Sequence, residues 1–277
     1  MKVGVVMNKN ARYEYIMNDL KNKAEIVKEK GYTLLALFLQ GSQNYDLDVY
    51  DDDYKSDIDC KAIIIPSFKD IVLDRKPIST TLVLDNNEHI ELKDIRIMKD
   101  MWIKQNISYI ELLYTDFIVY GEYGKEFVDY LLRFRDDIAN INKNQFLKCI
   151  KGMAMEKLKA LEHPYPTIID KINKYGYDPK QLHHIMRLYD FVYEYLINER
   201  PIKECYKTVH QRQLIAVKKG LYDLLTAREK ANEYYNELCS ICDRDITDSD
   251  IVDKESIDKL NGWVYKVLEY YMKKELN

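Results

Sequence analysis

Long apolar runs are missing from this sequence of 277 residues. The longest, residues 34–39, has six residues, whereas a helix that crosses a bilayer needs about 20. The opening residues 1–7 are followed at once by Asn8-Lys9-Asn10, which is too early for the apolar core of a signal peptide. We therefore expect no membrane segment and a cytoplasmic location.

The sequence also has few glycines, prolines and cysteines, and its net charge is small. With 9 Gly and 6 Pro, the composition is neither collagen-like nor that of a disordered chain. The net charge of −4 argues against a dedicated double-stranded DNA binder, although a local basic face is compatible with it. The 5 Cys are an odd number without an export signal, which favours free thiols. Cys239 and Cys242 form one C-x-x-C motif without the second ligand pair of a zinc site, so we expect helix packing there.

The first half of the chain has the pattern of a sheet with helices. A helix is expected over residues 11–30, and the continuous apolar run 32–40 is typical of a central buried strand. Further strands are expected over residues 56–66, 80–84 and 89–92. After Asp94 the apolar period changes from about 2 to about 3.6 residues, which indicates helices.

From residue 124 onward the pattern is helical. We expect helices near residues 124–137, 143–162, 167–175, 179–198, 207–218, 221–242 and 254–274. The predicted fold class is therefore α+β, with an N-terminal mixed sheet and flanking helices over residues 1–140. A C-terminal all-α domain is expected over residues 141–277.

Carboxylates gather where the predicted strands begin. Asp57 and Asp59 are two residues apart on a strand, so both project from one face, about 6–7 Å apart at Cα. Glu91 alternates with Ile90 and Leu92 on a later strand and supplies a third acid. Carboxylate oxygens are the ligands that Mg²⁺ prefers, and a two-metal site activates an attacking hydroxyl and stabilises leaving pyrophosphate.

Gly41-Ser42 follows the buried strand 32–40. Glycine lets the backbone approach a phosphate, and the serine hydroxyl with nearby N–H groups can donate hydrogen bonds to its oxygens. A D-x-D pair alone is common in acidic proteins, and the neighbouring run 51–53 is better explained as a solvated loop. The order strand, Gly-Ser, acidic loop, Ser-Asp-x-Asp and acid-bearing strand is more specific. It predicts a phosphate-binding turn beside a divalent-metal site.

This order resembles the signature of the DNA polymerase beta-like nucleotidyltransferases, G-S-x-x-Y-G-L followed by S-D-x-D. Here it reads Gly41-Ser42-x-x-Tyr45-x-Leu47 and then Ser56-Asp57-Ile58-Asp59. Within that superfamily the sequence is most similar to predicted bacterial and phage nucleotidyltransferases that include RNA-repair-pathway members. The supporting segments are residues 91–98, 107–113, 176–188 and 213–220. Asp46 stands where the family has glycine, and Glu91 where it commonly has aspartate.

The resemblance implies a catalytic nucleotidyltransferase domain and a helical domain that closes over the nucleotide. Asp57, Asp59 and Glu91 would bind Mg²⁺ or Mn²⁺ and act in catalysis. Gly41 and Ser42 would hold the triphosphate of an NTP such as ATP.

Further phosphate ligands are expected on the helical half. Lys180, His184 and Arg187 fall at i, i+4 and i+7 and so share one helix face. A solvated face of ordinary charges is the simpler explanation, but the resemblance favours triphosphate binding, with Arg187 offering a planar fork. Lys218 is a further candidate, about as well explained as a surface lysine.

The expected activity is transfer of a nucleoside monophosphate from an NTP to a hydroxyl, with release of pyrophosphate. The acceptor is an RNA 3′ end such as that of tRNA, a protein side chain or a small molecule. No motif specifies which one, nor the base preference or the oligomeric state. Two alternatives stay open: a catalytically silent nucleotide-binding or antitoxin-like regulatory module on the same fold, and a non-enzymatic interaction protein built on the Tyr-rich helical half.

Overall fold

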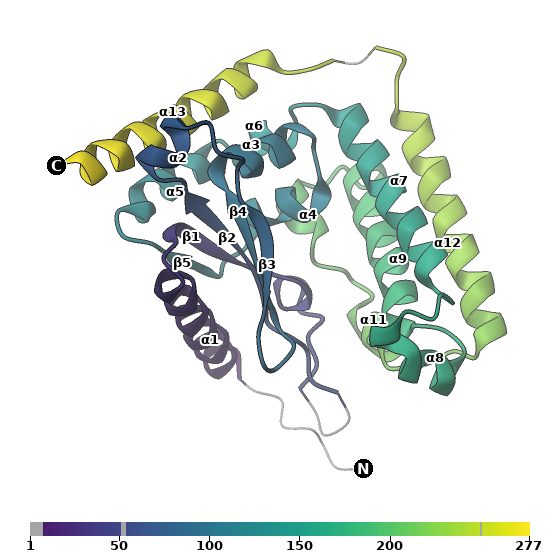
Figure 1. Ribbon diagram of the computed structural model, residues 1–277. Coiled ribbons are helices and arrows are strands. Elements are labelled where there is room, and N and C mark those ends of the chain that lie inside the picture. Colours follow the sequence, from purple (N-terminus) through teal and green to yellow (C-terminus); the bar gives the residue numbers. More distant parts are fainter. Residues whose placement is uncertain (1–7, 51–53, 250) are drawn as a thin grey trace. The chain divides into compact units, whose positions relative to one another are not determined.

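The computed structural model describes residues 8–50, 54–249 and 251–277 (Figure 1). It has a five-stranded mixed sheet, many helices and a C-terminal helical region, which confirms the predicted α+β class. The expectations for residues 1–7 and for the acidic run 51–53 lie outside the described residues. None of the described helices has both the length and the apolar character that a bilayer crossing requires.

The chain divides into two compact units. The first contains the described residues of 8–44, 50–142 and 252–277, and the second contains the described residues of 45–49 and 143–251. One junction between the units follows residue 142. Residues 252–277 belong to the first unit and residues 45–49 to the second.

The first unit is built on one sheet. Its strands are β1 (Thr33–Gln40), β2 (Asp59–Ile65), β3 (Ser79–Val83), β4 (His89–Asp94) and β5 (Ile118–Tyr120). Their order is β3-β4-β2-β1-β5. β2 and β4 are parallel, and the other neighbouring pairs are antiparallel. β1 and β2 lie inside the sheet, which explains their nearly continuous burial.

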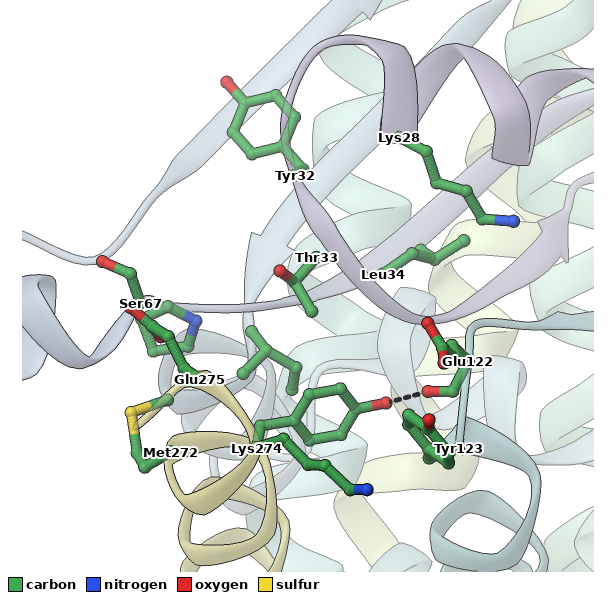
Figure 2. Close-up of a pocket in the computed structure, with 13 residues that line it drawn as sticks. Lys28, Tyr32, Thr33, Leu34, Ser67, Glu122, Tyr123, Met272, Lys274 and Glu275 are labelled. Atoms are coloured by element: carbon green, nitrogen blue, oxygen red, sulfur yellow. Dashed lines mark hydrogen bonds between the residues drawn. The ribbon is translucent and has the colours of Figure 1, made fainter. Parts of the chain in front are cut away.

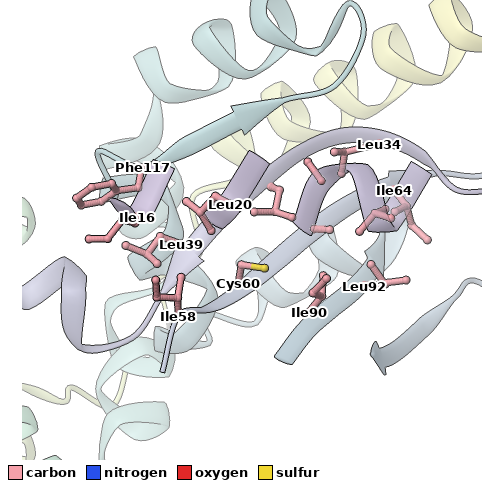
Figure 3. Packing of buried hydrophobic residues seen from close by; sticks show 14 residues of the cluster. Ile16, Leu20, Leu34, Leu39, Ile58, Cys60, Ile64, Ile90, Leu92 and Phe117 are labelled. Carbon is pink, nitrogen blue, oxygen red and sulfur yellow. The ribbon is translucent and has the colours of Figure 1, made fainter. Parts of the chain in front are cut away.

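Helix α1 (Lys9–Glu29) covers one face of this sheet. Its buried apolar residues recur at helical spacing: Ile16, Leu20, Ala24 and Val27. They form one cluster with alternate residues of the central strands, among them Leu37, Leu39, Cys60, Ala62, Ile90 and Leu92 (Figure 3). Because these residues face α1, the intervening side chains of β2 and β4 project from the opposite face.

The first unit contains further helices. They are α2 (Phe68–Val72), α3 (Ile95–Ile103), α4 (Ile107–Ile110), α5 (Gly124–Arg133), α6 (Arg135–Ala139) and α13 (Lys254–Leu276). Of these, α3 and α5 contact the strands. Trp263 of α13 is 1% exposed, and its ring centroid lies 6.0 Å from that of Trp102 on α3. The Trp263 indole N–H donates to the carbonyl of Phe127 on α5 at 2.8 Å. The last helix in the sequence is therefore part of the N-terminal unit.

The second unit contains only helices among its described residues. They are α7 (Lys143–Ala160), α8 (Ile169–Tyr175), α9 (Pro179–Val192), α10 (Ile202–Cys205), α11 (Gln211–Lys218) and α12 (Leu224–Asp245). α9 packs against α7, α11 and α12, which explains why it is buried on several sides. The predicted helix 179–198 is instead two pieces, because a π-helical turn over Tyr193–Ile197 follows α9.

Three short elements escaped prediction. β5, α2 and α10 have three, five and four residues, too few for a periodic pattern to become visible. β5 pairs with the edge of β1, and α2 begins at a capping box formed by Ser67 and Asp70.

Candidate functional site

The Gly41-Ser42 turn and the Asp57–Asp59 segment lie at the same end of the sheet. β1 and β2 are antiparallel, and Gln40, the last residue of β1, is paired with Asp59, the first residue of β2. Gly41 has φ +103°, a left-handed value that side chains disfavour, so glycine is required for the sharp exit from β1.

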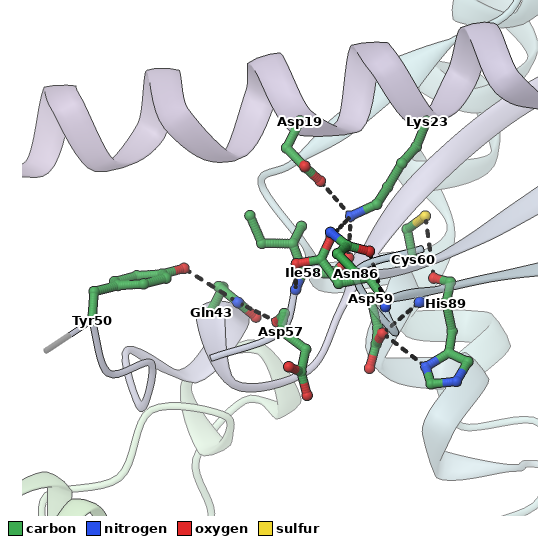
Figure 4. Close-up of polar contacts among 11 residues, drawn as sticks. Asp19, Lys23, Gln43, Tyr50, Asp57, Ile58, Asp59, Cys60, Asn86 and His89 are labelled. Carbon is green, nitrogen blue, oxygen red and sulfur yellow. Dashed lines mark hydrogen bonds and ion pairs between the residues drawn. The ribbon is translucent and has the colours of Figure 1, made fainter. Parts of the chain in front are cut away.

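The loop after Gly41 is tied to the start of β2. A short 3₁₀ turn spans Ser42–Tyr45, and the Asn44 N–H donates to the Gly41 carbonyl at 3.1 Å. Gln43 is 1% exposed, and its side-chain amide donates to the Asp57 carbonyl at 2.6 Å (Figure 4). This contact fixes the Gly-Ser turn next to the acidic pair. The order of the motifs predicted that the two lie together, but it did not predict the Gln43 contact that joins them.

Asp57 and Asp59 are accessible carboxylates on one side of the sheet. Asp57 is exposed, and the Asp59 side chain is 32% exposed, whereas Ile58 between them is buried against the cluster under α1. Both carboxylates point away from α1 (Figure 4). Because side chains alternate between the two faces at the start of β2, both acids project from the same side of the sheet.

The side chain of the neighbouring strand that contacts Asp59 is His89 rather than Glu91. Asp59 Oδ1 accepts the backbone N–H of His89 at 2.9 Å and lies 3.3 Å from its Nδ1. The parallel pairing explains this, because Cys60 is aligned with Ile90, which brings the preceding residues of the two strands together.

Glu91 is engaged with other groups. It is aligned with Lys61 across the parallel ladder, and it pairs with the ammonium groups of Lys61 and, at 2.8 Å, Lys93. The Tyr109 hydroxyl donates to Glu91 Oε1 at 2.7 Å, and Lys61 Nζ lies 4.3 Å from the Tyr109 ring centroid. Burial alone would raise the pKa of Glu91, but the two lysines and Tyr109 lower it to about 2.

The predicted convergence of Asp57, Asp59 and Glu91 is therefore not seen. Among the residues that the structure describes, no three His, Cys, Asp or Glu side chains lie close enough to hold a metal ion. Mg²⁺ in nucleotide sites is typically held by one or two carboxylates together with substrate phosphates. Asp57 and Asp59 fit that manner of binding, whereas Glu91, already neutralised by two lysines, does not.

A buried ion pair that sequence reasoning missed supports the start of β2. Lys23 of α1 is 2% exposed and pairs with Asp19 and, at 2.7 Å, with Glu88. Lys23 also donates to the Ile58 carbonyl, and Glu88 accepts the Ile58 N–H at 3.0 Å. Burial would lower the pKa of Lys23, but its two acidic partners raise it. The only sequence signal was a lysine on the apolar stripe of a helix.

The predicted cationic face lies on α9. Lys180 and His184 are half-buried, and Arg187 is buried. Burial, together with the neighbouring His183 and Arg187, holds the pKa of His184 well below its usual value, so its ring is neutral at pH 7. The phosphate-binding roles of these three residues and of Lys218 stay predictions.

Two of these cations hold the segment Tyr45–Val49 inside the helical unit. The Arg187 guanidinium lies 4.1 Å from the centroid of the Tyr45 ring, and Tyr45 stacks on Tyr206 at 6.0 Å. Lys218 is buried and donates to the Leu47 carbonyl at 3.3 Å. This explains why residues 45–49 belong to the second unit.

A cavity of about 580 Å³ lies at the other end of the sheet (Figure 2). It is formed where β1 starts and β2 ends, with Thr33 and Ile65 in its wall, and α13 contributes Tyr271 and Lys274. The Tyr271 hydroxyl donates to the Glu122 carbonyl inside it. No residue of the predicted site lines this cavity.

The cysteines are free thiols, as expected. Cys242 is buried on α12, and burial raises the pKa of its thiol to about 12. A thiol protonated at neutral pH is a poor nucleophile and metal ligand, so this geometry fits the packing role expected of the C-x-x-C motif.

Comparison with models of known protein families gives no match, and comparison with curated proteins gives none either. Among solved structures, the chain is similar to a nucleotidyltransferase-like protein from Exiguobacterium sibiricum 255-15. The identity is 11% and the TM-score 0.30, over 92% of this chain and 91% of that one.

Proposed function

We propose that this protein is a metal-dependent nucleotidyltransferase that moves a nucleoside monophosphate from an NTP to a hydroxyl acceptor. The observation that carries the proposal is the junction of β1 and β2. There the Gly41-Ser42 turn is tied through Gln43 to the chain that presents Asp57 and Asp59. A phosphate-binding turn beside two accessible carboxylates is what NTP bound with a divalent cation requires.

Each residue has a distinct role in this proposal. The backbone at Gly41 and the hydroxyl of Ser42 donate hydrogen bonds to phosphate oxygens. Asp57 and Asp59 hold Mg²⁺ or Mn²⁺, which supplies positive charge to the reacting phosphate. Gln43 and the Lys23–Glu88 pair position the two acids by fixing the backbone of residues 57 and 58.

A second candidate function is a nucleotide-binding module without catalysis. The pairing of Glu91 with Lys61 and Lys93 favours it, because the third acid of the predicted metal site is engaged with other groups. Binding without transfer would suit a regulatory or antitoxin-like protein.

The test is label transfer from each α-³²P-NTP. The full chain is incubated with Mg²⁺ or Mn²⁺ and total cellular RNA, and RNA and protein are then separated. We expect label in one fraction for the wild type and at least 100-fold less for the Asp57→Asn/Asp59→Asn variant, since these acids hold the cation. The matched control is Asp258→Asn, which removes an exposed carboxylate on α13.

Three outcomes are decisive. Label that survives Asp57→Asn/Asp59→Asn contradicts the proposal. No label with any NTP, but metal-dependent NTP binding by calorimetry, establishes the binding module instead. Absence of both transfer and binding rejects a nucleotide site at this junction.

A further inference from the structure

His89 is the residue that lies beside Asp59. The two residues begin the neighbouring parallel strands β2 and β4, and both side chains project from the face opposite α1. Glu91, two residues further along β4, faces Lys61 instead. The register of β2 against β4 therefore determines which side chain of β4 lies next to the acidic pair, and that side chain is the imidazole of His89.

The separation of the two side chains suits a shared cation. Two ligand atoms about 2.1 Å from a metal ion lie about 3.0 Å apart at an octahedral angle and about 3.4 Å apart at a tetrahedral angle. Asp59 Oδ1 and His89 Nδ1 are 3.3 Å apart (Figure 4). The His89 backbone N–H donates to the same Asp59 oxygen, which holds the carboxylate next to the ring.

Both groups are also open to solvent. The His89 side chain is 50% exposed and that of Asp59 32%, so a hydrated ion can reach them. Before nucleotide binds, no third side chain among the described His, Cys, Asp and Glu residues completes the coordination, so the other positions are left to water. In the NTP complex of the proposed function, Asp57 and phosphate oxygens take some of these positions.

We infer that Asp59 and His89 form a mixed carboxylate–imidazole site that binds Mn²⁺ in preference to Mg²⁺. Imidazole suits first-row transition metals, whereas Mg²⁺ selects oxygen ligands almost exclusively. This inference deepens the proposed function, because it names the cation of that site. It assigns Glu91 to the ion-pair network with Lys61 and Lys93 and to no metal.

The experiment measures Mn²⁺ binding by the full chain without nucleotide, from the loss of the free-Mn²⁺ electron paramagnetic resonance signal. Mg²⁺ affinity follows from competition. We expect His89→Ala and Asp59→Asn each to weaken Mn²⁺ binding at least tenfold. His89→Ala should lower the Mn²⁺/Mg²⁺ affinity ratio by a similar factor, and Glu91→Gln should leave it unchanged. The matched control is His163→Ala, which removes an exposed histidine of the helical unit.

A second measurement locates the ion directly. In proton NMR, Mn²⁺ at substoichiometric amounts should broaden the ring signals of His89 before those of the other histidines. Equal Mn²⁺ affinity in wild type and His89→Ala overturns the inference, as does loss of binding in a correctly folded Glu91→Gln. If the protein binds no Mn²⁺, the inference is wrong and the Asp59–His89 contact is only a hydrogen bond.

The two proposals fail separately. If Mn²⁺ binds as expected but no NTP binds or is transferred, the nucleotidyltransferase proposal is wrong and the cation site stands. If transfer depends on Asp57 and Asp59 while His89→Ala leaves Mn²⁺ affinity intact, only the present inference is wrong.

Discussion

At the scale of single residues, the surroundings of a carboxylate decide what it can do. Asp59 and Glu91 both stand on strands, on the same face of the sheet, and both are acids of the predicted metal site. Asp59 is open to solvent beside a histidine, while Glu91 receives two ammonium groups and a phenol. A carboxylate neutralised in this way gains little from a cation, so its main contribution is to stability.

The first prediction at this scale concerns Glu91→Gln. We expect it to lower the free energy of unfolding by about 1–3 kcal/mol at pH 7, because Lys61, 4% exposed, loses its charged partner. The pKa of Glu91 is lowered to about 2 in the folded protein. The ion pair therefore stabilises the fold fully at a pH above the usual pKa of glutamate, and this stabilisation is lost as the pH falls through the pKa of the folded state.

The pH dependence supplies the control for that prediction. The difference in free energy of unfolding between wild type and Glu91→Gln is measured by urea unfolding at pH 6 and at pH 3.5. We expect this difference to be about 1 kcal/mol smaller at pH 3.5. A difference that is independent of pH over this interval would contradict the ion-pair role of Glu91.

At the scale of elements, cations expected to bind phosphate also organise the helical unit. Arg187 of α9 lies over Tyr45, and Lys218 of α11 donates to the Leu47 carbonyl, so two helices hold the segment Tyr45–Val49. A buried guanidinium over an aromatic ring is worth about 2 kcal/mol, more than an exposed pair.

The prediction at this scale is a coupling between Arg187 and Tyr45. In a double-mutant cycle with Arg187→Met and Tyr45→Leu, measured by chemical unfolding, we expect a coupling energy of about 1–2 kcal/mol. The control cycle uses Lys230 and Tyr222, whose cation-to-centroid distance is 5.8 Å, and should give less than about 0.5 kcal/mol. Additive effects at Arg187 and Tyr45 would show that the stacked pair contributes nothing.

At the scale of the whole molecule, the first and last described helices, α1 and α13, belong to the same unit. Helix α13 comes last in the sequence, yet its Trp263 is buried against Trp102 of α3. The Trp263 indole N–H also donates a hydrogen bond to the carbonyl of Phe127 on α5. A division of the protein at residue 141 would therefore remove a helix from the core of the N-terminal unit.

The prediction here is that Trp263→Ala destabilises the first unit selectively. Loss of this side chain should cost about 3–5 kcal/mol. Hydrogen exchange should speed up in α3 and α5 while α9 and α12 keep their protection. Tyr265→Ala, which truncates a 65% exposed residue of the same helix, is the control and should change little. Equal loss of protection in α9 would contradict the assignment of α13 to the first unit.

Local pattern alone predicted much of this protein. Apolar periodicity predicted α1 and most helices of the second unit, because burial on one face imposes that period on an amphipathic helix. A continuous apolar run predicted the central strand β1, which is buried on both faces. Alternation predicted that Asp57 and Asp59 share a side, and the Gly-Ser pair marked the sharp exit from β1. These features depend on neighbours in sequence, which the sequence displays directly.

Tertiary structure decided the rest. The partner of Asp59 depends on the register of two parallel strands that are not consecutive in sequence, and a shift of two residues would exchange His89 for Glu91. The places of α13 and of the segment Tyr45–Val49 depend on which distant surfaces bury Trp263 and Tyr45. Long-range pairing is selected by the summed packing of the whole core, so no local pattern can specify it.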